Sequence, residues 1–434
     1  MAGAEIGVPD TGDTAWILTS AALVLLMTPG LAFFYGGMVR SKNVLNMIMM
    51  SISAMGLIGV LWVLYGYSIA FGTDKASLIG DPTEFFGLRT LFTGFGEDSV
   101  GVPLTGTIPT LVFVGFQAMF AIITVALISG AVADRMKFSA WLVFAGIWAT
   151  VVYFPVAHWV WGGGWIGEKI GAIDFAGGTA VHINSGAAAL ALALVLGKRK
   201  GWPKTPFRPH NLPFVMLGAG LLWFGWFGFN AGSAGAADGV AAATFVTTIV
   251  ATAAALLAWL LVEKFRDGRP TSLGAASGIV AGLVAITPAC ASVNVLGALF
   301  IGAVAGAACA LAVGLKFKFG YDDSLDVVGI HLVGGVIGTV LIGLVGTADA
   351  PTAANGLFYG GGFDVLWRQI VGAVAVLAYS LVIAAVIALA IKATIGLRAT
   401  PEEEATGMDE SEHAETAYDF AAVGGTARTA VKEA

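Results

Sequence analysis

The sequence is dominated by apolar segments of about 20 residues that recur between short polar breaks. A helix of that length crosses the hydrocarbon core of a bilayer, whereas a transmembrane barrel shows a weaker, alternating pattern. Charged residues make up 12% of the chain, against roughly 25% in ordinary soluble domains. The chain is therefore expected to be an all-α integral membrane protein. We predict eleven transmembrane helices, near residues 14–37, 44–71, 106–131, 138–160, 174–196, 212–232, 240–263, 273–288, 293–315, 325–346 and 366–393.

The positions of the 22 Lys and Arg residues predict the orientation of these helices. Eighteen of them lie in one set of loops and in the C-terminal tail, and the other set of loops holds Lys75, Arg89, Lys169 and Arg368. Because cytoplasmic loops are enriched in basic residues, we expect a multi-pass plasma (inner) membrane protein with its N-terminus outside and its C-terminus in the cytoplasm. No small-residue cleavage site follows the first apolar segment, so no signal peptide is expected.

Two long stretches lie outside the predicted helices. Residues 72–105 form an external connection rich in Gly, Pro and acidic residues, which either caps the outer face or contacts a neighbouring subunit. Residues 395–434 form an acidic cytoplasmic tail that follows a transmembrane domain of residues 1–394. The composition of the tail indicates disorder, and its Glu402-Glu403-Glu404 cluster argues against nucleic acid as a partner.

Two histidines lie inside predicted helices, each eight residues after an aspartate. His182 follows Asp174, and His331 follows Asp323. Eight residues of helix advance about 12 Å, so an aspartate at a membrane face would set its histidine near the middle of a core about 30 Å thick. Ionisable side chains at that depth cost free energy and tend to mark a transport pathway.

The two Asp-His elements run in opposite directions across the predicted membrane. Asp174 begins the fifth helix at the outer face, and Asp323 lies at the inner end of the tenth. This pattern predicts two inverted five-helix halves, residues 14–196 and 212–346, with the functional site at the midplane between them. The helix of residues 366–393 is then an appended span.

A transmembrane histidine has several possible roles: a buried hydrogen-bonding residue, a haem or metal ligand, or a proton and substrate relay. Small residues near both histidines favour close helix packing: Gly178, Gly186, Gly334 and Gly335. Close backbones leave too little space for a haem plane but suit two imidazoles in mutual hydrogen-bond contact. The only cysteines, Cys290 and Cys309, rule out a disulfide framework and a cysteine-based metal cluster.

Aromatic residues near the outer ends of the helices supply a second kind of site. Trp161 and Phe116 could hold a compact cation by cation–π attraction, about 0.5–2 kcal/mol per ring, with Ser233 accepting a hydrogen bond. Two neutral imidazoles on a narrow apolar path would pass a small neutral molecule that both donates and accepts hydrogen bonds. A cation that sheds a proton fits both ends, and ammonium is the simplest such ion.

Six ordered motifs resemble the Amt/Mep/Rh family of ammonium transporters, more closely its bacterial and archaeal Amt branch. The resemblance covers nearly the whole chain. The motifs are Thr28-Pro29-Gly30, Phe116-Gln117-x-x-Phe120, Asp174-Phe-Ala-Gly-Gly-Thr-x-Val-His182-Ile-Asn184, Gly225-Trp226-Phe227-Gly228-Phe229-Asn230-Ala231-Gly232-Ser233, Thr287-Pro288-Ala289-Cys290 and Asp326-Val-x-Gly-x-His331.

The resemblance implies a role for each matching residue. Trp161, Phe116 and Ser233 would form the outer recruitment site for ammonium, supported by Asp174, which would also help deprotonation. Phe120 and Phe229 would close the outer mouth of the pore, with Trp226 nearby. His182, His331 and Thr287 would line the pore and the proton relay. The implied fold has eleven helices with a pseudo-twofold axis.

The resemblance also implies partners and a mechanism. We expect a homotrimer in membrane lipid that carries ammonium or ammonia, and methylammonium as a further candidate, without a cofactor or metal and without enzymatic activity. The tail is similar to a cytoplasmic region that couples subunits and meets PII-type signalling proteins, which implies more order than its composition does. Ammonium would be recruited outside, deprotonated and conducted as ammonia, with separate proton transfer.

Other functions remain open on the sequence alone. If the proton stays behind, the protein would be a passive ammonia channel. An ammonium sensor that signals through its tail is a different class, as is a redox enzyme with His182 and His331 as haem ligands. An ordinary ion channel is disfavoured because the path lacks a ring of carbonyls or charged side chains.

Overall fold

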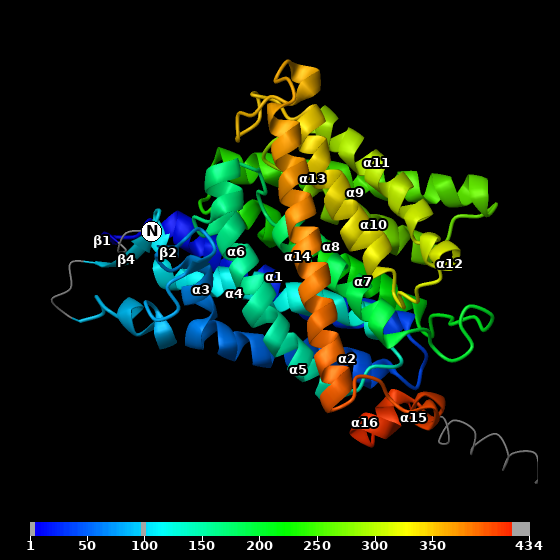
Figure 1. Ribbon diagram of the computed structural model, residues 1–434. Coiled ribbons are helices and arrows are strands. Elements are labelled where there is room, and N and C mark those ends of the chain that lie inside the picture. Colours follow the sequence, from blue (N-terminus) through cyan, green and yellow to red (C-terminus); the bar gives the residue numbers. More distant parts are fainter. Residues whose placement is uncertain (1–4, 97–100, 419–434) are drawn as a thin grey trace, which may run out of the picture.

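The computed structural model describes residues 5–96 and 101–418 of the 434-residue chain, and these residues form a bundle of long helices (Figure 1). Within them, ten helical segments are long and apolar enough to cross a membrane. The segments are α1 (Thr11–Met38), α2 (Val44–Leu61) continued by α3 (Tyr67–Phe71), α4 (Thr110–Ile128), α5 (Phe138–Trp148) continued by α6 (Phe154–Trp161), the turn Gly178–Ile183 continued by α7 (Asn184–Leu196), α8 (Leu212–Gly232), α9 (Gly239–Arg266), α11 (Val295–Ala312) continued by α12 (Leu315–Phe319), the turn Val328–Leu332 continued by α13 (Val333–Val345), and α14 (Asp364–Thr394).

The remaining predicted span corresponds to a shorter apolar helix, α10 (Ser272–Ile286), of 15 residues. It ends where the chain reaches Thr287 and Pro288, and a proline lacks the N–H that a continuing helix would use. The structure therefore confirms a multi-pass helical protein. The count of eleven spans stays a prediction.

Two predicted helices begin later than the sequence indicated. The span expected from residue 174 starts at Gly178, with a π-helical turn, Gly178–Ile183, before α7. The span expected from residue 325 starts at Val328, with a π-helical turn, Val328–Leu332, before α13. Gly177 (φ 123°) and Asp326 (φ 64°) have positive backbone angles, which a right-handed helix does not allow.

Glycines bring α1 and α8 into close contact. An ideal Cβ on Gly218 would lie 2.4 Å from the backbone nitrogen of Phe34, and one on Gly225 would lie 2.3 Å from Cγ of Met27. Only residues without a side chain permit this approach, which is how membrane helices commonly pack. The contact fixes one face of α1 against the rest of the bundle.

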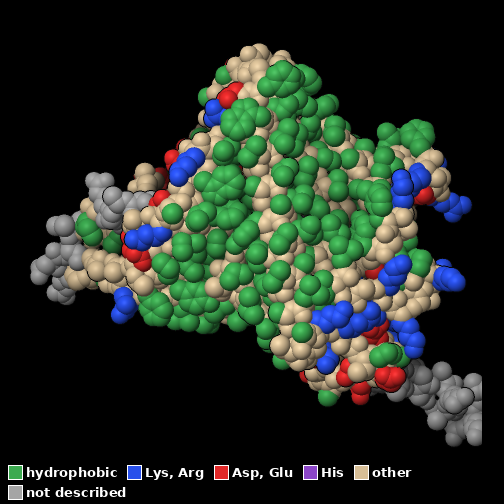
Figure 2. Space-filling view, viewed as in Figure 1, with side chains coloured by type: hydrophobic (Ala, Val, Ile, Leu, Met, Phe, Trp, Pro, Cys, Tyr) green, Lys and Arg blue, Asp and Glu red, His purple; other side chains and the backbone are tan. Residues whose placement is uncertain are grey.

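The surface has the distribution expected of a membrane protein. Figure 2 shows hydrophobic side chains spread over the broad middle of this face, while Lys, Arg, Asp and Glu gather at its edges. A bilayer stabilises such an apolar band, because each exposed apolar side chain is then removed from water.

Short strands gather at the end of the bundle that carries the N-terminus (Figure 1). One sheet has the order β1 (Glu5–Gly7), β4 (Val102–Thr105), β5 (Ile108–Pro109), and the hairpin β2 (Asp74–Lys75) and β3 (Ile79–Gly80) forms a second. These pairings tie residues 72–105 to their own chain, which agrees with a capping role; positions 97–100 lie outside the described residues.

The first part of the C-terminal tail is ordered. It forms two short helices, α15 (Pro401–Thr406) and α16 (Met408–His413), of which α16 contacts α2 (Figure 1). Asp409 accepts a hydrogen bond from the backbone of Asn46 at 2.8 Å, and Arg398 pairs with Glu404 at 2.5 Å. The disorder that composition indicates is therefore wrong for residues 395–418, because specific polar contacts hold them. The rest of the tail, 419–434, lies outside the described residues.

Candidate functional site

Two buried histidines are in direct contact. His182 lies in the turn Gly178–Ile183 and His331 in the turn Val328–Leu332, and they are 1% and 3% exposed. Their Nδ1 atoms are 3.3 Å apart, and their ring planes differ by 22°. A neutral imidazole has one N–H and one nitrogen with a free lone pair, so one Nδ1 donates this hydrogen bond and the other accepts it. The imidazole contact expected from the sequence is present.

Glycines allow this contact. An ideal Cβ on Gly186 would lie 2.5 Å from the backbone nitrogen of Leu332, and one on Gly335 would lie 3.1 Å from Cβ of His182. The backbones that carry the two histidines therefore approach as closely as glycine permits. Because the rings touch each other, no haem plane fits between them.

Each histidine turn begins at a buried aspartate. The Asp174 carboxylate accepts hydrogen bonds from the backbone N–H groups of Gly177, Gly178, Thr179 and Ala180 and from the Thr179 hydroxyl. Asp323 accepts from the N–H groups of Val327 at 3.2 Å and Val328 at 2.8 Å. Both carboxylates thus satisfy the free donors at the start of a helical segment.

The expected eight residues of helix between each aspartate and its histidine are therefore wrong. The helical part before His182 begins at Gly178, and the part before His331 begins at Val328. The preceding residues form the loop that the carboxylate holds. The aspartates cap the turns and do not form their first residues.

Two stacked phenylalanines lie between the histidines and a large cavity. The ring centroids of Phe120 and Phe229 are 4.1 Å apart and their planes differ by 24°. Both side chains are almost fully buried. The Phe229 centroid is 6.2 Å from that of His182, and Phe116 lies 4.9 Å from Phe120. The stacked rings separate the two spaces.

The large cavity, which we call the aromatic vestibule, has a volume of about 270 Å³. Its lining includes Phe71, Thr105, Ile108, Phe113, Phe116, Gln117, Phe120, Trp161 and Ser233. Ser233 donates its hydroxyl hydrogen to the carbonyl of Phe229 at 2.8 Å, so its oxygen retains lone pairs for a donor in the vestibule. Three of the predicted recruitment residues, Phe116, Trp161 and Ser233, are thus brought together.

Asp174, the fourth predicted recruitment residue, is not part of this lining. Its backbone carbonyl accepts a hydrogen bond from Trp161 Nε1 at 2.8 Å, while the residue is 8% exposed and its carboxylate is hydrogen-bonded to the following turn. Asp174 therefore connects Trp161 to the turn that carries His182. Its contact with the vestibule passes through Trp161.

The histidines line a small space, which we call the histidine chamber. Its volume is about 10 Å³, which is room for about one water-sized molecule. The lining is Met27, Leu31, Phe34, Ile123, Leu127, Val181, His182, Leu222, Trp226, Phe229, Val280 and His331. The imidazoles and the Trp226 indole supply the polar groups of an otherwise apolar lining.

Trp226 and Thr287 support one wall of the chamber. The Trp226 ring stacks on His182 with centroids 5.4 Å apart, and its Nε1 donates to the Thr287 hydroxyl at 2.8 Å. Thr287 in turn donates to the carbonyl of Leu283 at 2.7 Å. Thr287 therefore orients Trp226 and does not itself line the chamber.

A third cavity, which we call the basic cavity, has a volume of about 300 Å³. Its lining includes Met38, Arg199, Trp202, Phe207, Lys316, Phe317, Ser324 and Asp326. Part of its lining comes from the loop between α7 and α8.

One face of α1 connects the three cavities. Ile17 lines the aromatic vestibule, Leu31 and Phe34 line the histidine chamber, and Met38 lines the basic cavity. Steps of three and four residues keep side chains on one helix face. Met38 lies 21 positions after Ile17, a rise of about 31 Å along the helix, close to the thickness of a bilayer core. The cavities therefore follow one path across the bundle.

The sequence did not identify the apolar lining of this path. Met27, Leu31 and Phe34 lie around the Thr28-Pro29-Gly30 motif, for which the sequence pattern indicated no role in the path. The alignment of residues 17, 27, 31, 34 and 38 on one face was the available signal. His158 does not line the path: its two ring nitrogens lie 3.0 Å from the carbonyl oxygen of Ala70 and 2.9 Å from Asp74 Oδ1.

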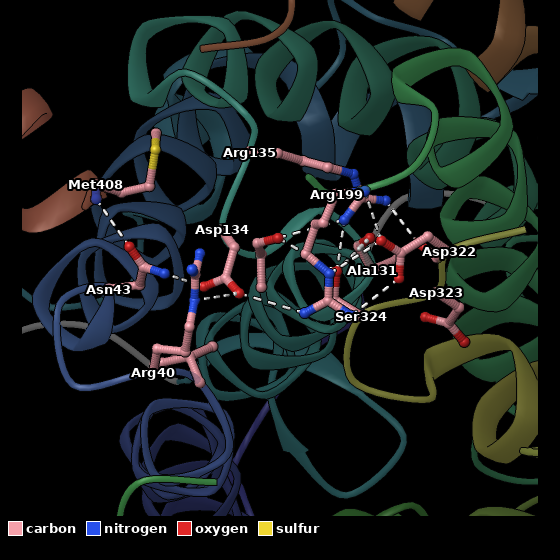
Figure 3. Close-up of polar contacts among 12 residues, drawn as sticks. Arg40, Asn43, Ala131, Asp134, Arg135, Arg199, Asp322, Asp323, Ser324 and Met408 are labelled. Atoms are coloured by element: carbon pink, nitrogen blue, oxygen red, sulfur yellow. Dashed lines mark hydrogen bonds and ion pairs between the residues drawn. The ribbon is translucent and has the colours of Figure 1, made fainter. Parts of the chain in front are cut away.

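A buried ion-pair network lies beside Asp323 (Figure 3). Asp134 pairs with Arg40 and with Arg199, each at 3.3 Å, and Arg199 pairs with Asp322 at 2.9 Å. Burial disfavours the Asp322 carboxylate, but the hydrogen bonds and charge of Arg199 hold its pKa below its usual range. By contrast, burial and the neighbouring Asp326 raise the pKa of Asp323 to about 6.

Within residues 5–96 and 101–418, no group of three His, Cys, Asp or Glu side chains could hold a metal ion. The imidazoles on the path can form hydrogen bonds with a small molecule. The aromatic rings at one end are suited to attracting a cation.

Comparison with known proteins gives the family. The model of the Ammonium Transporter Family matches residues 15–418. An ammonium transporter of Mycobacterium tuberculosis is 67% identical over 97% of this chain and 93% of its own length. One from Bacillus subtilis is 49% identical over 94% of this chain and 98% of its own length.

Solved structures agree with the sequence comparison. The crystal structure of Saccharomyces cerevisiae Mep2 has a TM-score of 0.82 and 36% identity, covering 91% of this chain and 88% of its own. A structure described as a sensor Amt protein has a TM-score of 0.84 and 28% identity, covering 93% of this chain and 98% of its own. With the family model spanning nearly every described residue, this chain belongs to the ammonium transporter family.

Proposed function

We propose that the protein binds ammonium in the aromatic vestibule, removes a proton from it and conducts ammonia past His182 and His331. The observation that carries the proposal is the 3.3 Å contact of two buried imidazoles in a chamber of about 10 Å³. The chamber suits one small molecule that both donates and accepts hydrogen bonds. Ammonia is such a molecule.

The apolar lining favours the neutral form of the substrate. An unpaired cation in a space lined mainly by Leu, Met, Phe and Val side chains would lose its hydration without full compensation. Deprotonation removes that cost. Potassium has a similar charge but no proton to give, so the same step would reject it.

The imidazole pair has a defined pattern of free groups. If one Nδ1 donates to the other, the donating ring keeps a lone pair on Nε2 and the accepting ring carries Nε2–H. His182 Nε2 is buried without a partner among the described residues. The pair therefore offers one donor and one acceptor to ammonia. The same pair could relay the proton separately, which would make transport electrogenic.

The residues around the vestibule have complementary roles in this proposal. Trp161 and Phe116 attract ammonium through their ring faces, and Ser233 accepts one of its N–H groups. Phe120 and Phe229 form the gate through which ammonia enters the chamber. Asp174 holds Trp161 and favours loss of the proton, while Trp226 and Thr287 support the chamber wall.

The wider architecture follows the same proposal. We propose two inverted five-helix halves with α14 appended, a vestibule that faces outside, and a homotrimer with one path in each subunit. The ordered tail supports a cytoplasmic regulatory role, for which a PII-type protein is the proposed partner. The enrichment of Lys and Arg beside the basic cavity supports this orientation.

The test is an electrical recording from purified protein in proteoliposomes after an ammonium pulse, with luminal pH followed in parallel. Inward positive current with ammonium but not with potassium is the expected result. Luminal alkalinisation without current would replace the electrogenic mechanism with a passive ammonia channel. Neither signal from correctly oriented protein would overturn transport.

A second candidate function is an ammonium sensor that signals through the tail. Two observations favour it: the similarity to the sensor Amt protein and the contacts of α16 with the start of α2. A protein that binds ammonium in a thermal-shift assay but transports none would support this candidate. Ammonium flux in the proteoliposome assay would contradict a sensor that binds ammonium without transporting it.

A further inference from the structure

Groups in and beside the basic cavity would hold an ammonium ion, but a lysine already occupies them. Lys316 Nζ donates to Asp326 Oδ1 at 2.6 Å and to the backbone carbonyl of Asp323 at 3.0 Å. It also lies 5.6 Å from the centroid of the Phe317 ring. A carboxylate, a carbonyl and an aromatic ring together form a cation site, and the ammonium group of Lys316 fills it.

Other aromatic rings of this cavity are covered in the same way. Arg199 lies 4.0 Å and Arg40 5.1 Å from the centroid of Phe207. Lys198 Nζ lies 5.2 Å from the centroid of Trp202. A Lys or Arg side chain of the protein therefore already lies over each of these rings.

The aromatic vestibule differs in this respect. In the part of the chain that the structure describes, no Lys or Arg lies over Phe116, Phe120 or Trp161. No cation of the described chain therefore competes for these three rings, although both cavities are rich in aromatic residues. The two ends of the path thus differ in which cation their rings can accept.

We propose that Lys316 fills an ammonium-sized site at the inner end of the path and so prevents that end from retaining ammonium. Asp326 stands five residues before His331 and lines the basic cavity, as does Met38 at the end of the path-lining face of α1. Without the Lys316 side chain, this site would bind ammonium at the end of the path where the ion has to be released. Lys316 is thus a specificity-determining residue of the exit.

A binding experiment that does not depend on transport tests whether ammonium can take the place of the Lys316 side chain. Lys316→Ala removes the ammonium group, and Lys316→Met does so while keeping most of the apolar stem. The thermal unfolding midpoint of each purified variant is measured in ammonium chloride and in sodium chloride. Ligands that bind the folded state raise this midpoint. We expect the ammonium-minus-sodium difference to be larger in both variants than in the wild type.

Two controls separate site occupancy from a change of charge. Lys200→Ala removes an exposed lysine of the neighbouring loop for which the structure shows no ion pair or ring contact, and Lys316→Arg keeps a cation in the site. Both should show the wild-type difference between the salts. A difference in Lys316→Ala and Lys316→Met no larger than in the wild type would overturn the proposal.

A transport measurement tests the consequence; the exit role of Lys316 rests on the proposed function, whereas the binding result does not. Ammonium at the face of the basic cavity should inhibit Lys316→Met at a concentration about 2- to 5-fold lower than the wild type, because one ring and one carboxylate are freed. Equal inhibition of Lys316→Met and Lys200→Ala would overturn the exit role. Absence of transport by the wild type would instead contradict the proposed function and leave the binding result standing.

Discussion

Gly186 and Leu332 are so close that the position of a Cβ on Gly186 lies 2.5 Å from the backbone nitrogen of Leu332. Leu332 directly follows His331, and Gly186 lies one helical turn after His182. The distance between the imidazoles is therefore set by the backbones that carry them. Any side chain at position 186 would push these backbones apart.

This relationship predicts the effect of Gly186→Ala. The added methyl group meets backbone atoms that cannot rotate away, so we expect a loss of about 1–3 kcal/mol in stability, together with reduced transport. Thermal unfolding in detergent and flux in proteoliposomes measure the two effects. Gly220→Ala is the matched control, because a Cβ at that helical glycine meets nothing within 4 Å. Equal behaviour of the two variants would contradict the packing argument.

Replacing a chamber histidine should change selectivity as well as rate. His331→Ala removes one partner of the Nδ1 contact, and we expect ammonium-driven current to fall by about tenfold or more, or the exclusion of potassium to weaken. His182→Ala should have a similar effect, since the two rings act as a pair. Current from purified variants, compared in ammonium and potassium, measures both quantities. A fully active His331→Ala protein with unaltered selectivity would contradict the proposed proton relay through the two histidines.

Ser233→Leu should weaken recruitment without removing the path behind it. The leucine cannot accept a hydrogen bond from ammonium, and its side chain would occupy part of the vestibule. We expect the ammonium concentration for half-maximal flux to rise by about 5-fold or more, on the basis of one lost hydrogen bond to a charged group. The control is Ser53→Leu, whose hydroxyl also donates to a carbonyl of its own helix, at 3.2 Å, but which does not line the vestibule. An unchanged half-saturation concentration in Ser233→Leu would argue against its role.

Much of the fold could be predicted because the bilayer imposes a simple rule on the sequence. Helices that cross a membrane need long apolar segments, and those segments stand out between polar loops. The ends of the helices were less predictable, because they depend on tertiary contacts. Asp174 and Asp323 were expected to begin helices but cap turns that start several residues later.

The candidate site could be predicted only in part. His182 and His331 stood out because an ionisable residue is rare in an apolar segment. Leu31 and Phe34 did not, since an apolar residue of a transmembrane helix can face lipid, another helix or a path. The cation over Phe317 was equally hidden, because Lys316 lies next to it in sequence and gives no sign of its contact with Asp326.

The Asp323 carboxyl predicts a pH dependence of stability. Burial and the charge of Asp326 raise its pKa from an ordinary 3.8 to about 6. A raised pKa means that the folded state binds the proton more tightly, so the stabilisation is full below pH 4 and is lost as pH rises through 6. Between pH 7.5 and pH 5, the wild type should gain on the order of 1 kcal/mol relative to Asp323→Asn. Unfolding midpoints of both proteins at the two pH values measure this, and parallel pH profiles would contradict it.

The stacked phenylalanines predict a gate that can be opened by truncation. Phe229→Ala removes one of two rings whose centroids are 4.1 Å apart between the vestibule and the chamber, so water and ions gain access to His182. We expect potassium conductance to appear in proteoliposomes with this variant and not with the wild type. Phe227→Ala is the matched control on the same helix, because Phe227 stacks on Phe245 at 4.2 Å but lines neither cavity. Potassium exclusion by both variants would mean that the histidine chamber alone provides the barrier.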